Sequence, residues 1–250
     1  MRIDFDSNLV EKTVFLFSRR NSRLERDIHA AVDPVYLQKD GPERDREFRR
    51  IYGAFFSKLD LGGVIREVLA EYPLIQERVD RCLIVEAQRR RDESSELLVR
   101  QPTDDGASPA RTLLIQVCPQ SLLDPERTAG PMRRELLHVS DMLDAAFGYD
   151  RQNLEGQSAE QNLIRDRYRV LWDIYVEARL WRNGRIDDGG FPRLLDLFSR
   201  TFSPDDPALT QRMFAKLRNT LEMTHGRLLA WARDPGSLLH NGPCFATADK

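Results

Sequence analysis

The residue types best suited to chemistry lie in segment 132–144, where Glu135 precedes His138 by three positions. In the zinc signature H-E-x-x-H, two histidines four positions apart lie on one helical face and bind the metal, while the glutamate acts as general base on the metal-bound water. Glu135 and His138 fill the last four positions of that signature, and Arg134 stands in the place of the first histidine. The segment therefore predicts a metal-hydrolase helix in which one ligand position has been replaced.

This pattern resembles the active-site helix of zincin metallopeptidases of the gluzincin type, over residues 112–181. The apolar segment 112–118 lies where those proteins have the strand that docks substrate. The resemblance implies that a carboxylate on a later helix supplies the third zinc ligand, and Asp173 and Glu177 lie four positions apart in the predicted helix 160–182. In the family the glutamate comes first and the aspartate orients a histidine, whereas here the order is reversed. We expect Glu177 at the ligand position and Asp173 as the orienting group, or the two roles exchanged.

Arg134 bears directly on whether such a site holds zinc. A guanidinium stays protonated in proteins and has no lone pair to donate to a metal. His138 and Glu177 alone give two protein ligands, whereas a catalytic zinc normally has three and a water molecule. An active zinc-dependent hydrolase or peptidase would therefore need Asp141, one turn after His138, or Asp173 as its third ligand.

The alternative is that the metal has been lost and that arginine replaces its charge. Buried carboxylates without a counter-charge are costly. Arg134 could bridge Glu177 or Glu135 through a bidentate contact. We favour this second outcome: a zinc-metallopeptidase-like protein with a degenerate RELLH site, impaired or inactive in catalysis, with Glu135 at the general-base position and zinc lost.

A third interpretation makes the same helix an ordinary packing element. A regular apolar stripe runs along it, at Met132, Leu136, Val139, Leu143 and Ala146. On this interpretation the polar residues of the motif are simply solvated, and His138 and Asp141 form a surface pair. The protein would then be a non-catalytic helical interaction or scaffold protein, unrelated to zincins.

The surrounding elements predict an α+β fold that is mostly helical, with a small antiparallel sheet before the motif helix. The expected strands form an antiparallel meander, and the first of them competes with a helix that would run on from residue 76. Ser7 is the expected N-cap of the first helix. The N-terminal helical part is expected at 1–75 and the zincin-like core with C-terminal helices at 76–250, or both as one continuous domain. The expected helices are 7–31, 43–59, a short one over 64–69, 131–146, 160–182, 192–201 and 205–232, and the expected strands are 82–87, 96–100 and 112–118.

Composition excludes several classes of protein. The 38 Lys and Arg residues against 40 Asp and Glu give a net charge of −2, which argues against a dedicated nucleic-acid binder. No apolar run approaches the roughly 18–20 residues that span a bilayer, and the acidic segment 1–12 does not resemble a secretory signal. Cys82, Cys118 and Cys244 form neither a metal pattern nor a disulfide pattern, as suits a reducing compartment. We expect a cytoplasmic protein whose partner is a peptide or another protein.

Overall fold

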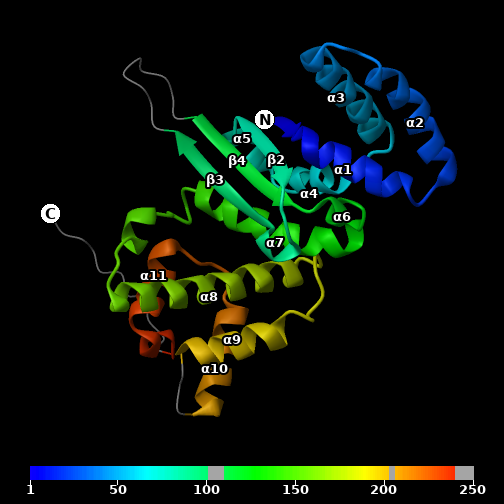
Figure 1. Cartoon of the computed structure of the whole chain (residues 1–250). Coiled ribbons are helices and arrows are strands. Elements are labelled where there is room, and N and C mark those ends of the chain that lie inside the picture. Colours follow the sequence, from blue (N-terminus) through cyan, green and yellow to red (C-terminus); the bar gives the residue numbers. More distant parts are fainter. Residues whose placement is uncertain (101–109, 203–205, 240–250) are drawn as a thin grey trace, which may run out of the picture. The chain divides into compact units, whose positions relative to one another are not determined.

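The computed structural model describes residues 1–100, 110–202 and 206–239, and the chain divides into two compact units (Figure 1). The first unit is Met1–Leu143 and the second is Asp144–Lys250. This division differs from the boundary expected near residue 75. The reason is that the first strand pairs directly with the strand at residues 81–86, so the N-terminal residues share one sheet with the core.

The sheet of the first unit is mixed rather than antiparallel. Its described strands are β1 (Arg2–Phe5), β2 (Arg81–Glu86), β3 (Ser94–Arg100) and β4 (Ala110–Val117), in the spatial order β1-β2-β4-β3. β1, β2 and β4 are parallel to one another, and only β3 runs antiparallel, along β4. The three strands expected from the sequence are present and β1 is additional, but the meander is wrong because β4 lies between β2 and β3. The expected α+β, mostly helical fold is confirmed.

The order of the strands follows from their side chains. Cys82 and Ile84 of β2 lie opposite Leu113 and Ile115 of β4, and all four are fully buried on one face of the sheet. Burying that apolar face drives the pairing of β2 with β4. β3 carries charged residues and exposed Val99, which suits the edge of the sheet, where one side of the strand stays unpaired.

The described part of the first unit also contains eight helical segments. The single helix expected over 7–31 is two helices, because the Asn21 side chain accepts hydrogen bonds from the Arg23 and Leu24 amides and starts a second helix. Asp6, not Ser7, caps the first helix, accepting from two backbone amides. The segments are α1 (Ser7–Ser18), α2 (Ser22–Tyr36), α3 (Gly41–Lys58), α4 (Gly63–Ala70), α5 (Pro73–Arg78), η1 (Arg90–Asp92), α6 (Pro119–Leu122) and α7 (Pro125–Leu143).

The second unit is a helical assembly around α8 (Ala159–Arg182), which packs against α9 (Phe191–Phe202), α10 (Pro207–Asn219) and α11 (His225–Arg233). The helix expected over 205–232 is interrupted after Asn219, and the Thr224 side chain caps α11 by accepting from the Arg227 amide. Short 3-10 segments, η2 (Arg151–Leu154) and η3 (Pro235–Leu239), complete the unit. No helix in the described part of the chain is both long and apolar enough to cross a membrane.

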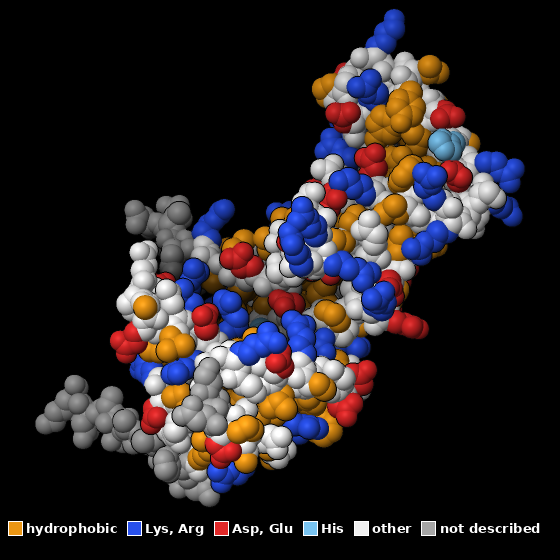
Figure 2. All heavy atoms as spheres, turned by 60° about the horizontal axis from the view of Figure 1, so that its bottom comes forward, with side chains coloured by type: hydrophobic (Ala, Val, Ile, Leu, Met, Phe, Trp, Pro, Cys, Tyr) orange, Lys and Arg blue, Asp and Glu red, His pale blue; other side chains and the backbone are white. Residues whose placement is uncertain are grey.

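Acidic and basic side chains are interspersed on the molecular face drawn in Figure 2, and neither sign covers that face alone.

Candidate functional site

The motif helix α7 is anchored to the end of α4 by a charged and a neutral contact. The Arg133 guanidinium binds both carboxylate oxygens of Glu71, at 2.8 Å from Nη2 to Oε1 and 3.0 Å from Nε to Oε2. The Tyr72 hydroxyl donates to the backbone carbonyl of Arg133 at 2.8 Å. The Glu71 carboxylate raises the pKa of Arg133 further above its usual range, so the arginine stays charged. These contacts fix the rotation of the helix at the residue directly before Arg134.

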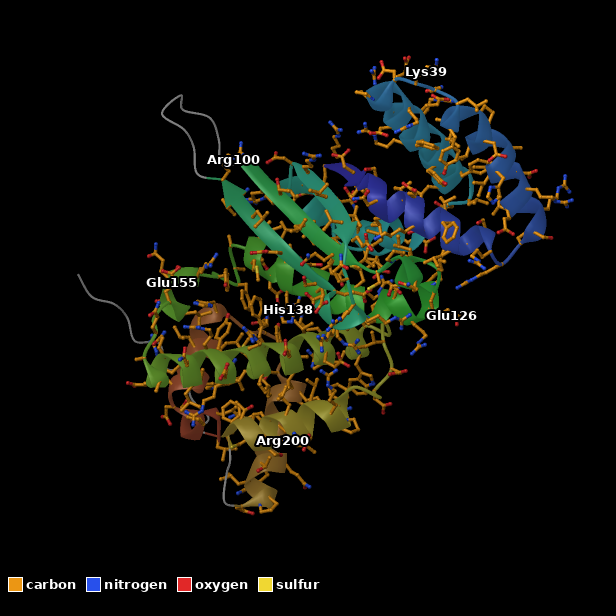
Figure 3. The ribbon with its side chains drawn as sticks, viewed as in Figure 1. Lys39, Arg100, Glu126, His138, Glu155 and Arg200 are labelled. Atoms are coloured by element: carbon orange, nitrogen blue, oxygen red, sulfur yellow. The ribbon has the colours of Figure 1, made fainter. Side chains whose placement is uncertain are left out.

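The polar residues of the motif are not an ordinary solvated face. Met132, Leu136 and Val139 are buried as the apolar stripe predicts, although the helix ends at Leu143 and Ala146 is exposed. Arg134, Glu135 and His138 are half-buried, and only 3 % of Asp141 is exposed. The expectation of simple solvation is therefore wrong, most clearly for Asp141. Figure 3 labels His138 on α7, with Glu126 in the first turn of the same helix.

Glu135 turns toward the edge strand of the sheet. Its Oε2 accepts a hydrogen bond from the backbone N–H of Ser95 on β3, at 3.2 Å. In an antiparallel pair, the N–H and C=O groups of successive residues point alternately toward the partner strand and away from it. The Ser95 N–H therefore points away from β4, and the same alternation directs the backbone groups of Leu97 and Val99 to the outer side of β3.

The strand that presents this outer side is not the one expected from the sequence. Segment 112–118 was the expected docking strand, but β4 has β2 on one side and β3 on the other, so both of its edges are paired. β3 is the edge strand beside α7, and the two contact each other. Docking of a peptide by strand pairing requires a strand with an unpaired edge. β3 (Ser94–Arg100) meets this requirement, whereas the expected segment 112–118 does not.

A cavity of about 270 Å³ opens beside Glu135, between η1, the start of β3, the end of β4 and α7. The Ser94 hydroxyl donates to the Gln116 side chain at 3.1 Å, and Glu93 accepts from the Cys118 amide at 2.8 Å. The Ser95 hydroxyl oxygen is buried and has no hydrogen-bond partner among the described residues. The cavity is lined by Arg90, Glu93, Ser94, Ser95, Gln116, Val117, Ser121, Arg127, Thr128, Pro131, Met132 and Glu135.

Sequence reasoning missed most of this cavity. Of the predicted site residues, only Glu135 lines it. The segment RRRDESS (89–95), which includes four of the lining residues, has the composition of a charged, solvated turn, and its sequence does not indicate a cavity. The signal in the sequence that could have indicated this cavity is the pair of serines just before the apolar residues of β3, since short hydroxyl side chains at the start of a strand can face a polar cavity.

The two predicted acids of α8 lie in the second unit and differ in burial. Asp173 is half-buried, whereas only 1 % of Glu177 is exposed. Their spacing of four positions places both on one face of the helix, as expected. Among the described acidic residues, Asp141 and Glu177 are the only two in the buried class. Both are positions at which the sequence predicts a metal ligand.

The described residues do not by themselves form a complete zinc shell. No group of three or more His, Cys, Asp or Glu side chains gathers as a metal site requires, within residues 1–100, 110–202 and 206–239. At the position of the first histidine, Arg134 offers no lone pair. The donor set present in the described residues therefore does not fit a catalytic zinc.

A second buried polar group lies in the second unit, at the first residue of α11. His225 is 3 % exposed, and its Nδ1 lies 2.8 Å from the hydroxyl of Tyr168. Its Nε2 has no hydrogen-bond partner among the described residues. The rings of Tyr149 and Tyr168 contact the imidazole edge-on, at centroid distances of 5.4 and 5.2 Å. Burial lowers the pKa of His225, which favours the neutral imidazole in the core of this unit.

Comparison with known proteins identifies no relative of this chain. No family model matches the chain, and neither a curated protein nor a solved structure is similar enough to count as a match.

Proposed function

We propose that this protein is a zincin-like, metallopeptidase-related protein whose metal site is degenerate, so that it binds a peptide or protein without hydrolysing it. The observation that carries the proposal is the burial of Asp141 and Glu177. An acidic side chain is almost never fully buried unless it is paired. One of these burials, that of Glu177, is at the position matched to the third zincin ligand, and the other lies one turn after His138. Both favour retained charged side chains over a chance E-x-x-H sequence.

Arg134 has the chemistry to replace the metal in such a cluster. Removing a divalent cation leaves carboxylates that must be compensated, because an uncompensated buried charge costs several kcal/mol. A guanidinium is always charged and offers five donors in a planar fork that matches a carboxylate. In this proposal Arg134 provides the positive charge that the metal would otherwise supply to these carboxylates.

The partner in this proposal is an extended peptide segment that pairs with β3. The outward backbone groups of Leu97 and Val99 offer donors and acceptors for strand addition, the general mode by which a sheet edge takes up a peptide. The cavity beside Glu135, at the start of the same strand, would receive a side chain of that peptide. Glu135 gives this end of the edge a negative charge.

Zinc content is the experiment that tests the proposal. Protein purified without a His-tag or chelator is expected to contain no stoichiometric zinc by inductively coupled plasma mass spectrometry. The Arg134→His variant restores the H-E-x-x-H pattern and is expected to bind about one zinc per chain, since it adds a third protein ligand to His138 and Glu177. Arg212→His, which adds a histidine at an exposed position of α10, is the matched control and is expected to bind none.

Two outcomes would overturn the proposal, each in favour of an alternative. Stoichiometric zinc in the unchanged protein would show that Asp141 or Asp173 completes the shell, and chelator-sensitive peptide hydrolysis would then identify an active hydrolase. A folded Arg134→His variant without zinc would remove the zincin relationship and leave a helical scaffold protein.

We also infer a reducing, cytoplasmic location. Cys82 and Cys118 are both buried free thiols, and Cys244 lies outside the described residues. Free thiols of this kind are typical of proteins kept in a reducing compartment.

A further inference from the structure

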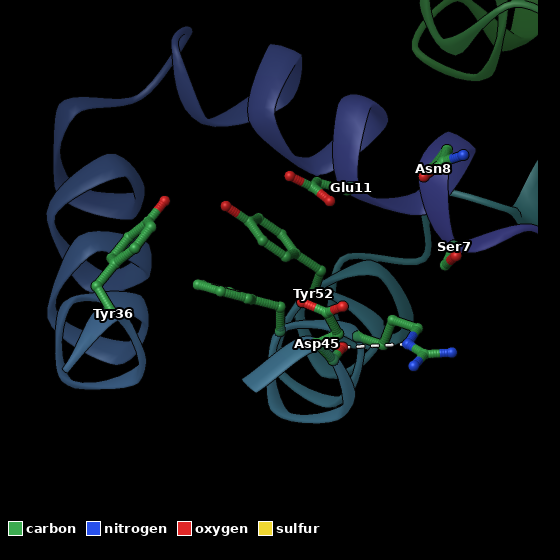
Figure 4. A pocket seen from close by; sticks show the side chains of 8 residues that line it. Ser7, Asn8, Glu11, Tyr36, Asp45 and Tyr52 are labelled. Atoms are coloured by element: carbon green, nitrogen blue, oxygen red, sulfur yellow. Dashed lines mark hydrogen bonds between the residues drawn. The ribbon is translucent and has the colours of Figure 1, made fainter. Parts of the chain in front are cut away.

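A second cavity, of about 290 Å³, lies in the first unit between α1, α2 and α3. Figure 4 shows Glu11 on α1 above it, with Tyr36 of α2 and Tyr52 of α3 pointing their hydroxyl groups into the same space. Its volume is close to the lower end of the range for small-molecule sites, about 300–1,000 Å³. It is lined by Ser7, Asn8, Glu11, Tyr36, Asp45, Phe48, Arg49 and Tyr52.

Three aromatic rings form the apolar wall of this cavity. Tyr36 and Phe48 meet edge to face with their centroids 5.0 Å apart. Tyr36 is 66 % exposed, an unusual position for a large ring that has no covering element among the described residues. Tyr52 is half-buried, and its pKa is raised by burial and by the nearby Glu11 carboxylate, so its hydroxyl stays protonated. The wall therefore presents neutral π-systems at neutral pH.

Two carboxylates give the cavity its charge. Neither Glu11 nor Asp45 forms an ion pair within the described residues. The Nε of Arg49 donates to the backbone carbonyl of Asp45 at 3.1 Å, so this hydrogen bond does not involve the Asp45 carboxylate. Arg49 is the single basic residue among those lining the cavity, which leaves the lining with an acidic excess.

We propose that this cavity binds an organic ammonium cation, carried either by a small amine or by a lysine side chain of another protein. A cation is attracted both to the faces of aromatic rings and to carboxylates, and an aromatic cage with acidic residues is a recurring arrangement for quaternary ammonium groups. The two carboxylates would repel an anion, and a neutral apolar ligand would not compensate their negative charge. This binding site is separate from α7 and does not depend on the function proposed for it.

Choline and its neutral isostere, 3,3-dimethylbutan-1-ol, are the probes that test the proposal on the full chain. The two have nearly the same shape and differ in charge, so a titration followed by NMR separates cation recognition from shape. Choline is expected to bind in the millimolar range and about tenfold more tightly than the isostere, as a cation–π contact plus a carboxylate predicts. Glu11→Gln and Tyr36→Leu are each expected to weaken choline binding about three- to tenfold.

Asp27→Asn is the control, because it removes one negative charge from an exposed position of α2 that does not line the cavity. It is expected to leave choline binding unchanged, and circular dichroism must show each variant folded. Equal binding of choline and its isostere, no binding of choline, or binding that both cavity variants leave unchanged would overturn the proposal. A lysine-containing peptide that binds at least about tenfold more tightly than butylammonium would assign the cation to a protein, and equal affinities would assign it to a free amine.

Discussion

Glu135 on α7 and Ser95 on β3 are joined by a hydrogen bond of 3.2 Å between the side-chain Oε2 and the backbone N–H, across 40 positions of sequence. A carboxylate that accepts a peptide N–H at a strand edge does what a neighbouring strand would do at that position. The residue at the general-base position of the motif is therefore also part of the structure that ends the pairing of β3.

Replacing Glu135 by alanine and by glutamine is expected to separate the contribution of its hydrogen bond to stability from that of its negative charge. Glutamine keeps a side-chain oxygen that can accept from Ser95, whereas alanine leaves the N–H without that partner. We expect alanine to lower the free energy of unfolding by about 1–3 kcal/mol and glutamine by clearly less. Urea denaturation of the two variants measures the difference. Equal losses would mean that the negative charge, rather than the hydrogen bond, stabilises the contact.

The two buried carboxylates are expected to be the acidic residues least tolerant of neutralisation. Glu177→Gln and Asp141→Asn remove a charge from a buried site while leaving its surroundings adapted to that charge. We expect each variant to lose about 3–5 kcal/mol of unfolding free energy, as is typical when one partner of a buried pair is removed. Chemical denaturation is the measurement.

Glu160→Gln is the matched control for these variants, since Glu160 is exposed in the first turn of α8. It is expected to change stability by less than about 0.5 kcal/mol. Buried-site variants as stable as this control would argue against the proposed role of Asp141 and Glu177 as charged residues of a former metal site.

His225 is expected to make stability depend on pH on the acidic side of neutrality. Burial is the main cause of its lowered pKa, Asp150 opposes the shift, and Arg233 reinforces it. Above a pH of about 6.5, the histidine is neutral in both the folded and the unfolded chain and contributes no pH dependence. Below that pH the unfolded chain binds the proton first, so stability falls until the folded-state pKa is reached.

Substituting His225→Phe keeps a ring in the cluster and removes this titration. The difference in unfolding free energy between the wild type and the variant is expected to shrink from pH 7.5 to 5, because only the wild type loses the histidine contribution. Denaturation at a series of pH values tests this. A constant difference over that range would exclude titration of His225 as a cause.

The two described cysteines are expected to be inert in the folded protein. Burial raises the pKa of Cys82 to about 12 and that of Cys118 to about 11, so both thiols stay protonated at pH 8. Because only the thiolate reacts with iodoacetamide, labelling of these residues is expected only after unfolding. Peptide mass spectrometry of native and denatured samples shows whether this is so, and rapid native labelling of Cys118 would place it in an accessible, activated environment instead.

The helices and the best strands could be predicted because their signals are local. The apolar stripe of α7 and the run of buried residues in β4 predict one element each. β4 lies within two residues of its expected range, whereas α7 begins at Pro125 instead of residue 131 and ends at Leu143 instead of residue 146. Breaks at Asn21 and Thr224 escaped prediction, although both side chains are typical helix caps. In each case the apolar period continued across the break and concealed it.

Strand order and side-chain burial depend on distant residues and could not be predicted in the same way. β3 follows β2 along the chain, yet β4 pairs with both, because the apolar faces of β2 and β4 bury each other. The burial of Asp141 is equally invisible in a helical pattern, which places a residue on a face but does not say what covers that face. The motif lies on a helix that the sequence pattern predicts, whereas the burial of its polar residues and the cavity beside it depend on the fold.

The pairing of β1 with β2 has a consequence for the order in which the chain assembles. Arg2–Phe5 align with residues 81–84, so closing this contact brings together two segments between which all of α1 to α5 lies. Such a closure is entropically slow compared with the formation of the intervening helices. During synthesis the first strand must therefore wait, unpaired, until β2 has left the ribosome, and the helical segments between them form first.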